Sequence, residues 1–221
     1  MPRTIVITGA SSGVGLAAAE QFAAAGDQVV MIGRTPARLD QAVARVRAAG
    51  GPEPHRFQAD FENLGQVRDL AAELRTAYPA IDVLANNAGG MVGDYRRTPD
   101  GFEATIQGNH LAPFLLTGLL RERLRRVVTT ASQAHRQGDP DPEDFIGNLD
   151  RYSSFQAYGA SKSANILFAA EAARRWPDVE SVSFHPGVVR SNFGADPVTR
   201  FFYRWAPFLT SPEKAGALLV W

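Results

Sequence analysis

A tyrosine and a lysine stand four positions apart in a helix-forming stretch in the second half of the chain, at Tyr158 and Lys162. Residues i and i+4 of an α-helix share a face, so the ammonium group can lie close to the phenol. A nearby cation favours the phenolate and lowers the pKa of a tyrosine below its usual value of about 10. Such a tyrosine can exchange a proton with an alcohol or a carbonyl near neutral pH. The same spacing is common on solvated helices, so this interpretation needs further support.

A glycine-rich turn near the N-terminus joins a short apolar run to a helix-forming stretch. Residues 4–8 are β-branched and apolar, which predicts a buried strand, and the turn after them has the spacing G-x-x-x-G-x-G. A strand, a glycine turn and a helix in this order direct backbone N–H groups and a helix N-terminus at a phosphate. An ordinary connection between a strand and a helix is the alternative. The predicted phosphate contacts of this turn are Gly9, Ser11, Ser12, Gly13, Val14 and Gly15.

Strands and helices alternate along the whole chain. The predicted strands are residues 3–8, 28–33, 54–59, 81–86, 126–131 and 179–185. The predicted helices are residues 13–25, 35–49, 63–77, 100–123 and 154–175. This alternation implies a parallel sheet with helices on both faces. The sequence therefore predicts the α/β class, as one doubly wound Rossmann domain over residues 1–221 with six or more parallel strands.

The composition argues against several other classes of protein. The 221 residues carry a formal net charge of zero and include no cysteine. A neutral chain gives no reason to expect a nucleic-acid or membrane partner, and a chain without cysteine has no disulfide or thiolate nucleophile. The first predicted strand begins too early to leave room for a signal peptide, so we expect a cytoplasmic protein. None of His110, His135 and His185 has a partner at metal-ligand spacing, so no metal site is predicted.

Several separated motifs together resemble the short-chain dehydrogenase/reductase family over nearly the whole chain. Residues 8–15 are similar to its glycine motif, residues 86–89 (NNAG) to the motif after its fourth strand, and residues 186–187 to the turn after its sixth strand. Residues 160–165 (ASKSAN) and 185–190 (HPGVVR) are similar to the retinol-dehydrogenase-like branch. The residues that match the family's catalytic tetrad are Asn109, Ser132, Tyr158 and Lys162.

The resemblance implies a role for each member of this tetrad. Ser132 would hydrogen-bond the substrate oxygen, and Tyr158 would give or take the proton. Lys162 would lower the pKa of Tyr158 and hold the nicotinamide ribose. Asn109 would hold a water that links Lys162 to solvent, although an asparagine within a helix can also simply kink or pack.

The choice between NAD and NADP depends on the residues after the second predicted strand. NAD enzymes usually have a carboxylate there for the adenine ribose, but residues 29–39 contain no Asp or Glu. Arg34 stands at this place instead, with Arg38 one helical turn further on. A guanidinium group suits a 2′-phosphate dianion, so NADP is favoured over NAD. The alternative is that both arginines are solvated residues at the start of a helix.

Further cofactor contacts follow from the resemblance. Asp60 is similar to the family's adenine-contacting Asp, although it could instead cap the helix that follows. The small residues of the NNAG motif would let the backbone approach the cofactor, while its asparagine amides brace neighbouring strands. Ser191 stands where the family commonly has Thr. The predicted contacts beyond the glycine turn are Arg34, Arg38, Asp60, Phe61, Asn87, Ala88, Gly89, Tyr158, Lys162, Pro186, Gly187, Val188 and Ser191.

An aromatic-rich segment follows the sixth predicted strand, where the family places its substrate lid. Its aromatic residues are Phe193, Phe201, Phe202, Tyr203, Trp205 and Phe208. An apolar lid would suit a hydrophobic alcohol or carbonyl, and packing onto the sheet or into an oligomer interface is the equal alternative. The family sheet has a seventh strand, for which these 221 residues leave no room.

The sequence thus predicts an NADP-dependent oxidoreductase that interconverts an alcohol and its carbonyl. A catalytically silent cofactor-binding regulator or scaffold is the alternative, and it would need none of the four tetrad residues. Helices 100–123 and 154–175 carry more apolar residues than one sheet face should need, so a homodimer through these helices is expected.

Overall fold

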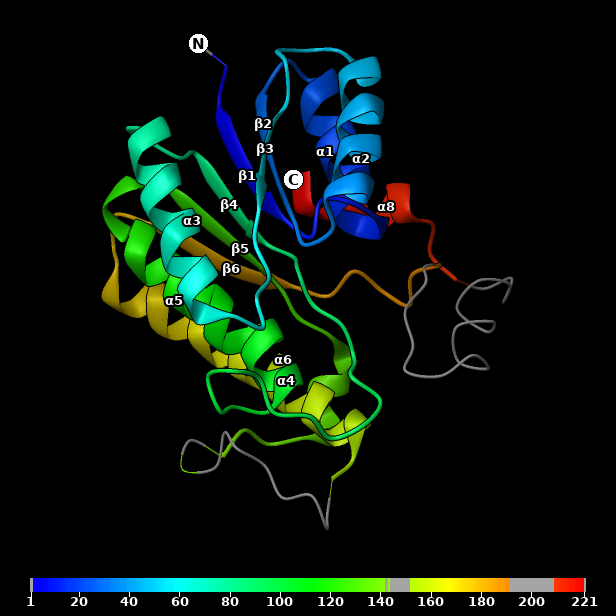
Figure 1. The fold of residues 1–221 in the computed structure, drawn as a ribbon, viewed down its shortest axis with the longest axis vertical. Coiled ribbons are helices and arrows are strands. Elements are labelled where there is room, and N and C mark those ends of the chain that lie inside the picture. The colour runs from blue at the N-terminus through cyan, green and yellow to red at the C-terminus, as the bar shows by residue number, and fades with distance from the viewer. Residues whose placement is uncertain (1, 142, 144–151, 191–208, 221) are drawn as a thin grey trace.

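One parallel sheet of six strands organises the computed structural model, which describes residues 2–141, 143, 152–190 and 209–220 (Figure 1). The strands are β1 (Thr4–Thr8), β2 (Gln28–Gly33), β3 (His55–Gln58), β4 (Val83–Asn86), β5 (Arg126–Thr130) and β6 (Glu180–Phe184). Their order across the sheet is β3-β2-β1-β4-β5-β6, and every pairing is parallel. The predicted doubly wound Rossmann fold is confirmed. Between β1 and β4 the strand order reverses, and ligands of such sheets bind at this point.

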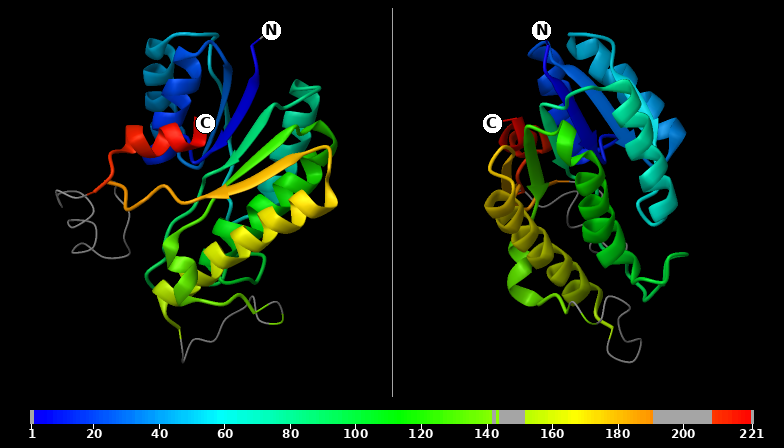
Figure 2. Two further views of the ribbon diagram at one scale, coloured as in Figure 1. Left: turned by 180° about the vertical axis from the view of Figure 1, so that it is seen from behind. Right: turned by 90° about the vertical axis from the view of Figure 1, so that its left-hand side faces the viewer.

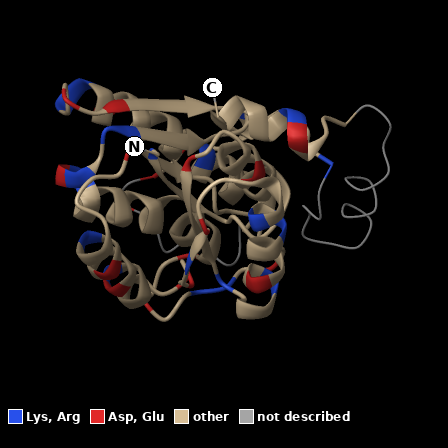
Figure 3. Ribbon diagram, turned by 90° about the horizontal axis from the view of Figure 1, so that it is seen from above, with Lys and Arg blue, Asp and Glu red and all other residues tan. Residues whose placement is uncertain are grey.

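Helices cover both faces of the sheet (Figures 1 and 2). One face carries α1 (Gly13–Ala24), α2 (Pro36–Ala49) and α8 (Pro212–Val220). The other carries α3 (Leu64–Ala77), α5 (Ala112–Leu120) and α6 (Ser154–Arg175). Basic and acidic residues are interspersed along the ribbon, in keeping with the net charge of zero (Figure 3).

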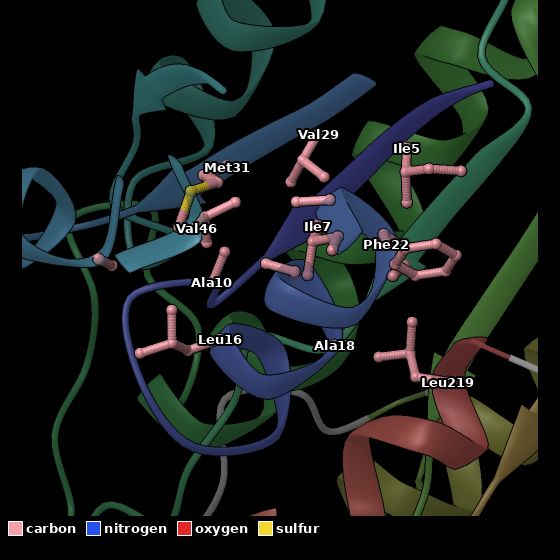
Figure 4. Close-up of a cluster of buried hydrophobic side chains, with 14 of the residues drawn as sticks. Ile5, Ile7, Ala10, Leu16, Ala18, Phe22, Val29, Met31, Val46 and Leu219 are labelled. Carbon is pink, nitrogen blue, oxygen red and sulfur yellow. The ribbon is translucent and has the colours of Figure 1, made fainter. Parts of the chain in front are cut away.

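The apolar run of β1 is buried on both sides. Ile5 and Ile7 point into the core beneath α1, where Phe22 and Leu219 also pack, whereas Val6 belongs to the core beneath α3 and α5 (Figure 4). None of these three β1 side chains has any exposed surface. Alternate residues of a strand face opposite sides of a sheet, so a strand covered on both faces is apolar throughout.

The predicted helix 100–123 is wrong in its first part and irregular in its middle. Its α-helical turns are α4 (Ala104–Ile106) and α5, and a π-helical turn, Gln107–Leu111, separates them. Pro113 has no N–H, so it cannot donate to the carbonyl of Asn109 four residues earlier, as a regular helix requires. Residues 121–123 form a 3-10 turn rather than a continuation of α5.

At its last strand the described sheet has an exposed edge, because β6 pairs with β5 alone. The described residues after β6 lead to α8, which packs against α1 on the face of the sheet opposite α6 (Figure 2). A Cβ at Gly216 would lie 2.8 Å from the backbone nitrogen of Ala18, so glycine permits this close approach.

Candidate active site

The glycine turn lies between the carboxyl end of β1 and the segment after β4. Gly9 has a φ of +67°, and a Cβ there would lie 2.9 Å from the Cα of Ala88. At Gly15, a Cβ would lie 2.5 Å from the carbonyl oxygen of Gly9. Any larger residue would push α1 away from the strand, so both glycines are needed for the tight connection.

The N-terminus of α1 keeps its first backbone N–H groups available for an anion. Ser12 occupies the N-cap position without a side-chain capping hydrogen bond, and the first turn contains no acidic residue. By contrast, Asn63 caps α3 by accepting from Gln66 N at 3.1 Å. An uncapped helix start with a positive dipole end suits the pyrophosphate of a dinucleotide.

Asn87 braces the strands that border the turn. Its amide Nδ2 donates to the carbonyl of Thr8 at 3.0 Å, and the hydroxyl of Thr8 accepts from the backbone N–H groups of Asn87 and Ala88. These bonds join the carboxyl ends of β1 and β4, and the partly buried Ala88 packs against the core beneath α3 and α5.

Lys162 is buried beside Tyr158 on α6. The residue is only 3% exposed, and its Nζ donates to the carbonyl of Thr130 at 3.0 Å. The Nζ lies 5.4 Å from the ring centroid of the half-buried Tyr158. Burial lowers the pKa of Lys162 from 10.5 to about 8, because a low-dielectric environment disfavours the ammonium form.

Asn109 lies in the π-helical turn and is fixed on every side. Its Oδ1 accepts from Gly90 N at 2.9 Å, and its Nδ2 donates to Gly90 O at 2.9 Å and to Ser161 Oγ at 3.0 Å. A Cβ at Gly89 would lie 2.8 Å from Asn109 Oδ1 and 3.5 Å from Lys162 Nζ. The NNAG segment, the π turn and α6 therefore meet closely around Lys162.

Ser132 follows β5, two residues after the carbonyl that accepts from Lys162. It is the N-cap of a 3-10 turn, Gln133–Gln137, and its Oγ accepts from Ala134 N at 3.2 Å. An accepting hydroxyl still has its own hydrogen to donate. The structure thus gathers Asn109, Tyr158 and Lys162 in one buried cluster and places Ser132 at the same edge of the sheet.

The two predicted arginines are both exposed at the far end of this edge. Arg34 follows β2, and its Nη1 lies 3.6 Å from Oε1 of Glu62. Glu62 also pairs with Arg96, whose pKa is raised by this hydrogen bond. Glu62 was not among the residues predicted from the sequence. Its position after the third strand could have identified it. β2 and β3 are parallel neighbours, so the residues that follow them meet at one edge of the sheet.

Asp60 and Phe61 lie in the turn between β3 and α3. Asp60 is not the cap of α3, because Asn63 fills that position, and its Oδ1 instead accepts from Glu62 N at 3.1 Å. The side chain of Phe61 is buried in the core beneath α3 and α5. Only the backbone of Phe61 can therefore face a ligand.

The turn after β6 is closed by residues from further along the chain. Thr210 donates to the carbonyl of Val188 and accepts from the N–H of Arg190, each at 2.9 Å. Gly187 has a φ of +84°, and a Cβ there would lie 2.9 Å from Thr210 Oγ1. Ser191 and the predicted aromatic lid, residues 193–208, lie outside the described residues.

The described part of the chain contains neither a metal-ion cluster nor a membrane-crossing helix. No group of three or more His, Cys, Asp or Glu could hold a metal ion there. None of its helices combines the length and the apolar character that crossing a membrane demands. His110 hydrogen-bonds the buried Asn165. Asn165 ends the ASKSAN motif, but no role was predicted for it.

These features define a class of protein. A doubly wound parallel sheet, a glycine turn before an uncapped helix, and a buried lysine beside a tyrosine at the same edge are those of a dinucleotide-dependent oxidoreductase. Residues 3–198 match the model of the short chain dehydrogenase family, and the chain belongs to this family. Members of this family are NAD(P)-dependent enzymes that act on CH–OH groups.

Comparison with curated proteins confirms the resemblance to the retinol-dehydrogenase-like branch. The chain is 53% identical over 221 residues to "Putative daunorubicin C-13 ketoreductase DnrU" of Streptomyces sp. (strain C5), covering 99% of this chain and 77% of the relative. It is 38% identical over 210 residues to retinol dehydrogenase 14 of Mus musculus, covering 87% and 63%. The chain thus spans slightly less than two thirds of that dehydrogenase.

Solved structures share the fold over nearly the whole chain. A short chain dehydrogenase of Shigella flexneri complexed with NADP has a TM-score of 0.78 and 26% identity, covering 99% of this chain and 90% of that one. A short-chain dehydrogenase of Sphingobium yanoikuyae in complex with NADPH has a TM-score of 0.77 and 25% identity, covering 99% and 84%.

Proposed function

We propose that this chain is an NADP-dependent oxidoreductase that interconverts an apolar alcohol and its carbonyl, with Tyr158 as the acid–base group. The observation that carries the proposal is the buried ammonium of Lys162, 5.4 Å from the Tyr158 ring. A charge buried at this cost is rarely kept without a task.

Tyr158 transfers the proton in this proposal. During reduction its hydroxyl gives a proton to the carbonyl oxygen, and during oxidation the phenolate takes one from the alcohol. The positive charge of Lys162 stabilises the phenolate, and the hydroxyl of Ser132 hydrogen-bonds the reacting oxygen. NADP(H), when bound, supplies or accepts the hydride.

The chain's residues fit a dinucleotide along this edge of the sheet. The uncapped start of α1 suits the pyrophosphate, and the small residues after β4 allow close approach of the nicotinamide half. Pro186, Gly187 and Val188 lie at the carboxyl end of β6, where they would border the carboxamide side. Solved relatives of this fold with bound NADP or NADPH support the same assignment.

Arg34 is the proposed selector of NADP over NAD. Its exposed guanidinium follows β2 with no acidic residue in 29–39, and Arg38 adds a second exposed charge. A 2′-phosphate dianion would gain charge-assisted hydrogen bonds from this fork. Glu62 lies within ion-pair distance of the same guanidinium, so it competes with the phosphate for Arg34.

The names of the relatives direct the substrate test. One is named as a C-13 ketoreductase of daunorubicin and others are named as retinol dehydrogenases. The test is a panel of carbonyl compounds that includes daunorubicin, retinal and small aliphatic ketones, with NADPH oxidation followed at 340 nm. We expect turnover with at least one bulky apolar carbonyl and weaker turnover with the small ketones.

The panel also separates an enzyme from a silent cofactor-binding protein. Tight binding of NADPH without oxidation by any carbonyl, and without reduction of NADP by the matching alcohols, would contradict the proposed function. Absence of NADPH binding would contradict both. Tyr158→Phe serves as the background in every assay, because it keeps the fold and removes the proton donor.

A homodimer through α5 and α6 is part of the proposal. Phe114 on α5 is 53% exposed and Leu167 on α6 is 60% exposed, so each helix presents a large apolar side chain that a partner could cover. Sedimentation at micromolar concentration should give about twice the 23.9 kDa chain mass, and Leu167→Glu should shift it toward the monomer. A single species of one chain mass for the native protein would contradict the dimer.

A further inference from the structure

A buried amide joins two backbone carbonyls next to Lys162. Asn165, on α6 and 3% exposed, donates from Nδ2 to the carbonyl of Asn109 at 3.1 Å and to the carbonyl of Thr130 at 3.3 Å. The carbonyl of Thr130 is also the acceptor of Lys162 Nζ, at 3.0 Å. One side chain therefore connects the π-helical turn, the end of β5 and the acceptor of the buried ammonium.

The histidine beside it contacts the oxygen of the same amide. His110 Nδ1 lies 3.1 Å from Asn165 Oδ1, an atom that can only accept, so Nδ1 carries the hydrogen. Burial lowers the pKa of His110, and the positive charge of Lys162 acts in the same direction, whereas the hydrogen bond to Asn165 acts in the opposite direction. The ring packs against Phe114 and Phe168. The two carbonyls can only accept, so Nδ2 faces them, and the hydrogen bond from His110 holds Oδ1 on the other side.

The carbonyl of Asn109 needs this donor. The carbonyl of Asn109 has no helical partner four residues later, because Pro113 lacks an N–H. A buried carbonyl without a donor costs about 1–3 kcal/mol. Asn165 supplies a donor to Asn109 and, with the same group, restrains the carbonyl on which Lys162 rests.

We propose that Asn165, oriented by His110, is a positioning residue for proton transfer: it sets the place of the Lys162 ammonium relative to Tyr158. The inference rests on the proposed roles of Tyr158 and Lys162. In this arrangement Asn165 acts through the Thr130 carbonyl, which it shares with Lys162 Nζ. Without the amide, the ammonium is less fixed and stabilises the phenolate less.

The test measures the ionisation of Tyr158 without turnover. The ultraviolet absorbance of phenolate is titrated in each protein with and without Tyr158→Phe, and the difference isolates Tyr158 from the other four of the chain's 5 tyrosines. Asn165→Ala should raise the apparent pKa of Tyr158 by about one unit, as expected for a partly lost charge interaction. His110→Phe, which keeps a buried ring and frees the amide, should raise it by less.

A matched control separates positioning from stability. Thr117→Val on α5 removes another buried side-chain donor, one that bonds Pro113 O at 2.7 Å, and should leave the Tyr158 titration unchanged. An Asn165→Ala titration that moves no more than that of Thr117→Val overturns the proposal. If Asn165→Ala does not fold, the His110→Phe titration decides in its place, and no shift there overturns it.

Kinetics give the second readout. Asn165→Ala should lower kcat about tenfold at neutral pH and shift its pH profile upward, with KM changed by less than about twofold, since proton transfer and not binding is affected. A change confined to KM would contradict the positioning role. If no carbonyl is turned over by the native protein, the proposed function fails while the Tyr158 titration still decides this inference.

Discussion

The two ends of the proposed cofactor crevice use charge in opposite ways. At the β2 end, Arg34 has 65% of its side chain exposed and shares Glu62 with Arg96. At the β5 end, Lys162 is buried, and its Nζ donates to the carbonyl of Thr130, which also accepts from the Asn165 amide. Exposed ion pairs are worth about 0–1 kcal/mol, whereas an ammonium in a low-dielectric interior interacts strongly with its neighbours.

This difference separates recognition from chemistry. An exposed guanidinium that can exchange one acidic partner for another suits the reversible binding of a phosphate. A buried ammonium has a high cost in stability, but its interaction with a neighbouring phenol is screened less than that of an exposed charge. Substitutions at the two ends should therefore differ in size, in salt dependence and in their effect on folding.

The largest effect is expected from Tyr158→Phe. Loss of the acid–base hydroxyl should lower kcat/KM by about 10²–10⁴-fold, while NADPH binding and thermal stability stay near native. Tyr78→Phe is the control, since its hydroxyl contacts His55 far from the crevice. Retention of most of the rate by Tyr158→Phe would mean that another group transfers the proton.

Lys162→Met should abolish activity and yet stabilise the fold near pH 7. The pKa of Lys162 falls from 10.5 to about 8 on folding, which corresponds to roughly 3 kcal/mol against the charged form. The unfolded chain binds more protons between these values, so native stability should rise as pH increases from about 8 to 10.5 and remain penalised below 8.

Urea unfolding across this pH range checks the sign. At pH 7 the Met variant should be more stable than the native protein by about 1–3 kcal/mol. The contribution of the lost hydrogen bond to Thr130 must be subtracted from this gain. The variant should also lack the increase in stability above pH 8. Lys214→Met, on the exposed side of α8, is the matched control and should keep that rise. A Met variant less stable than native at pH 7 would show that Lys162 is not penalised by burial.

Arg34→Ala tests the recognition end. The loss of charge-assisted contacts worth about 1.5–3 kcal/mol should weaken NADPH binding tenfold or more and leave NADH binding unchanged. Titration of nicotinamide fluorescence gives both dissociation constants. Arg45→Ala, which removes an exposed arginine paired with Glu20, is the control. Equal affinity of the native protein for NADPH and NADH would defeat the argument.

The smallest effect is expected from Glu62→Gln. Removal of the competing carboxylate should strengthen NADPH binding by about 0.2–1 kcal/mol, which is less than about sixfold, and the gain should shrink as salt is added. Glu53→Gln, which breaks the exposed pair with Arg47, should change nothing. Weaker binding by Glu62→Gln would instead mean that Glu62 orients Arg34 for the phosphate.

Several elements could be predicted because their signals are local. The strand at residues 28–33 and the helix at residues 154–175 have the predicted bounds, since a run of β-branched residues and an i, i+4 pattern depend on near neighbours. The helix predicted at 100–123 failed in part, because residues 100–103 form a turn and Pro113 forces a π-helical segment. The spacing of apolar residues does not reveal that Pro113 lacks the N–H that a regular helix needs.

The sequence by itself determined the doubly wound class, the glycine turn, and the pairing of Tyr158 with Lys162 on one helix. Each follows from spacing within a few residues. Only the tertiary structure placed Glu62 against Arg34 and turned Asn165 toward the carbonyls of two other elements. The physical reason is that parallel strands bring distant residues to one edge, and that buried polar groups must find partners wherever the packed chain offers them.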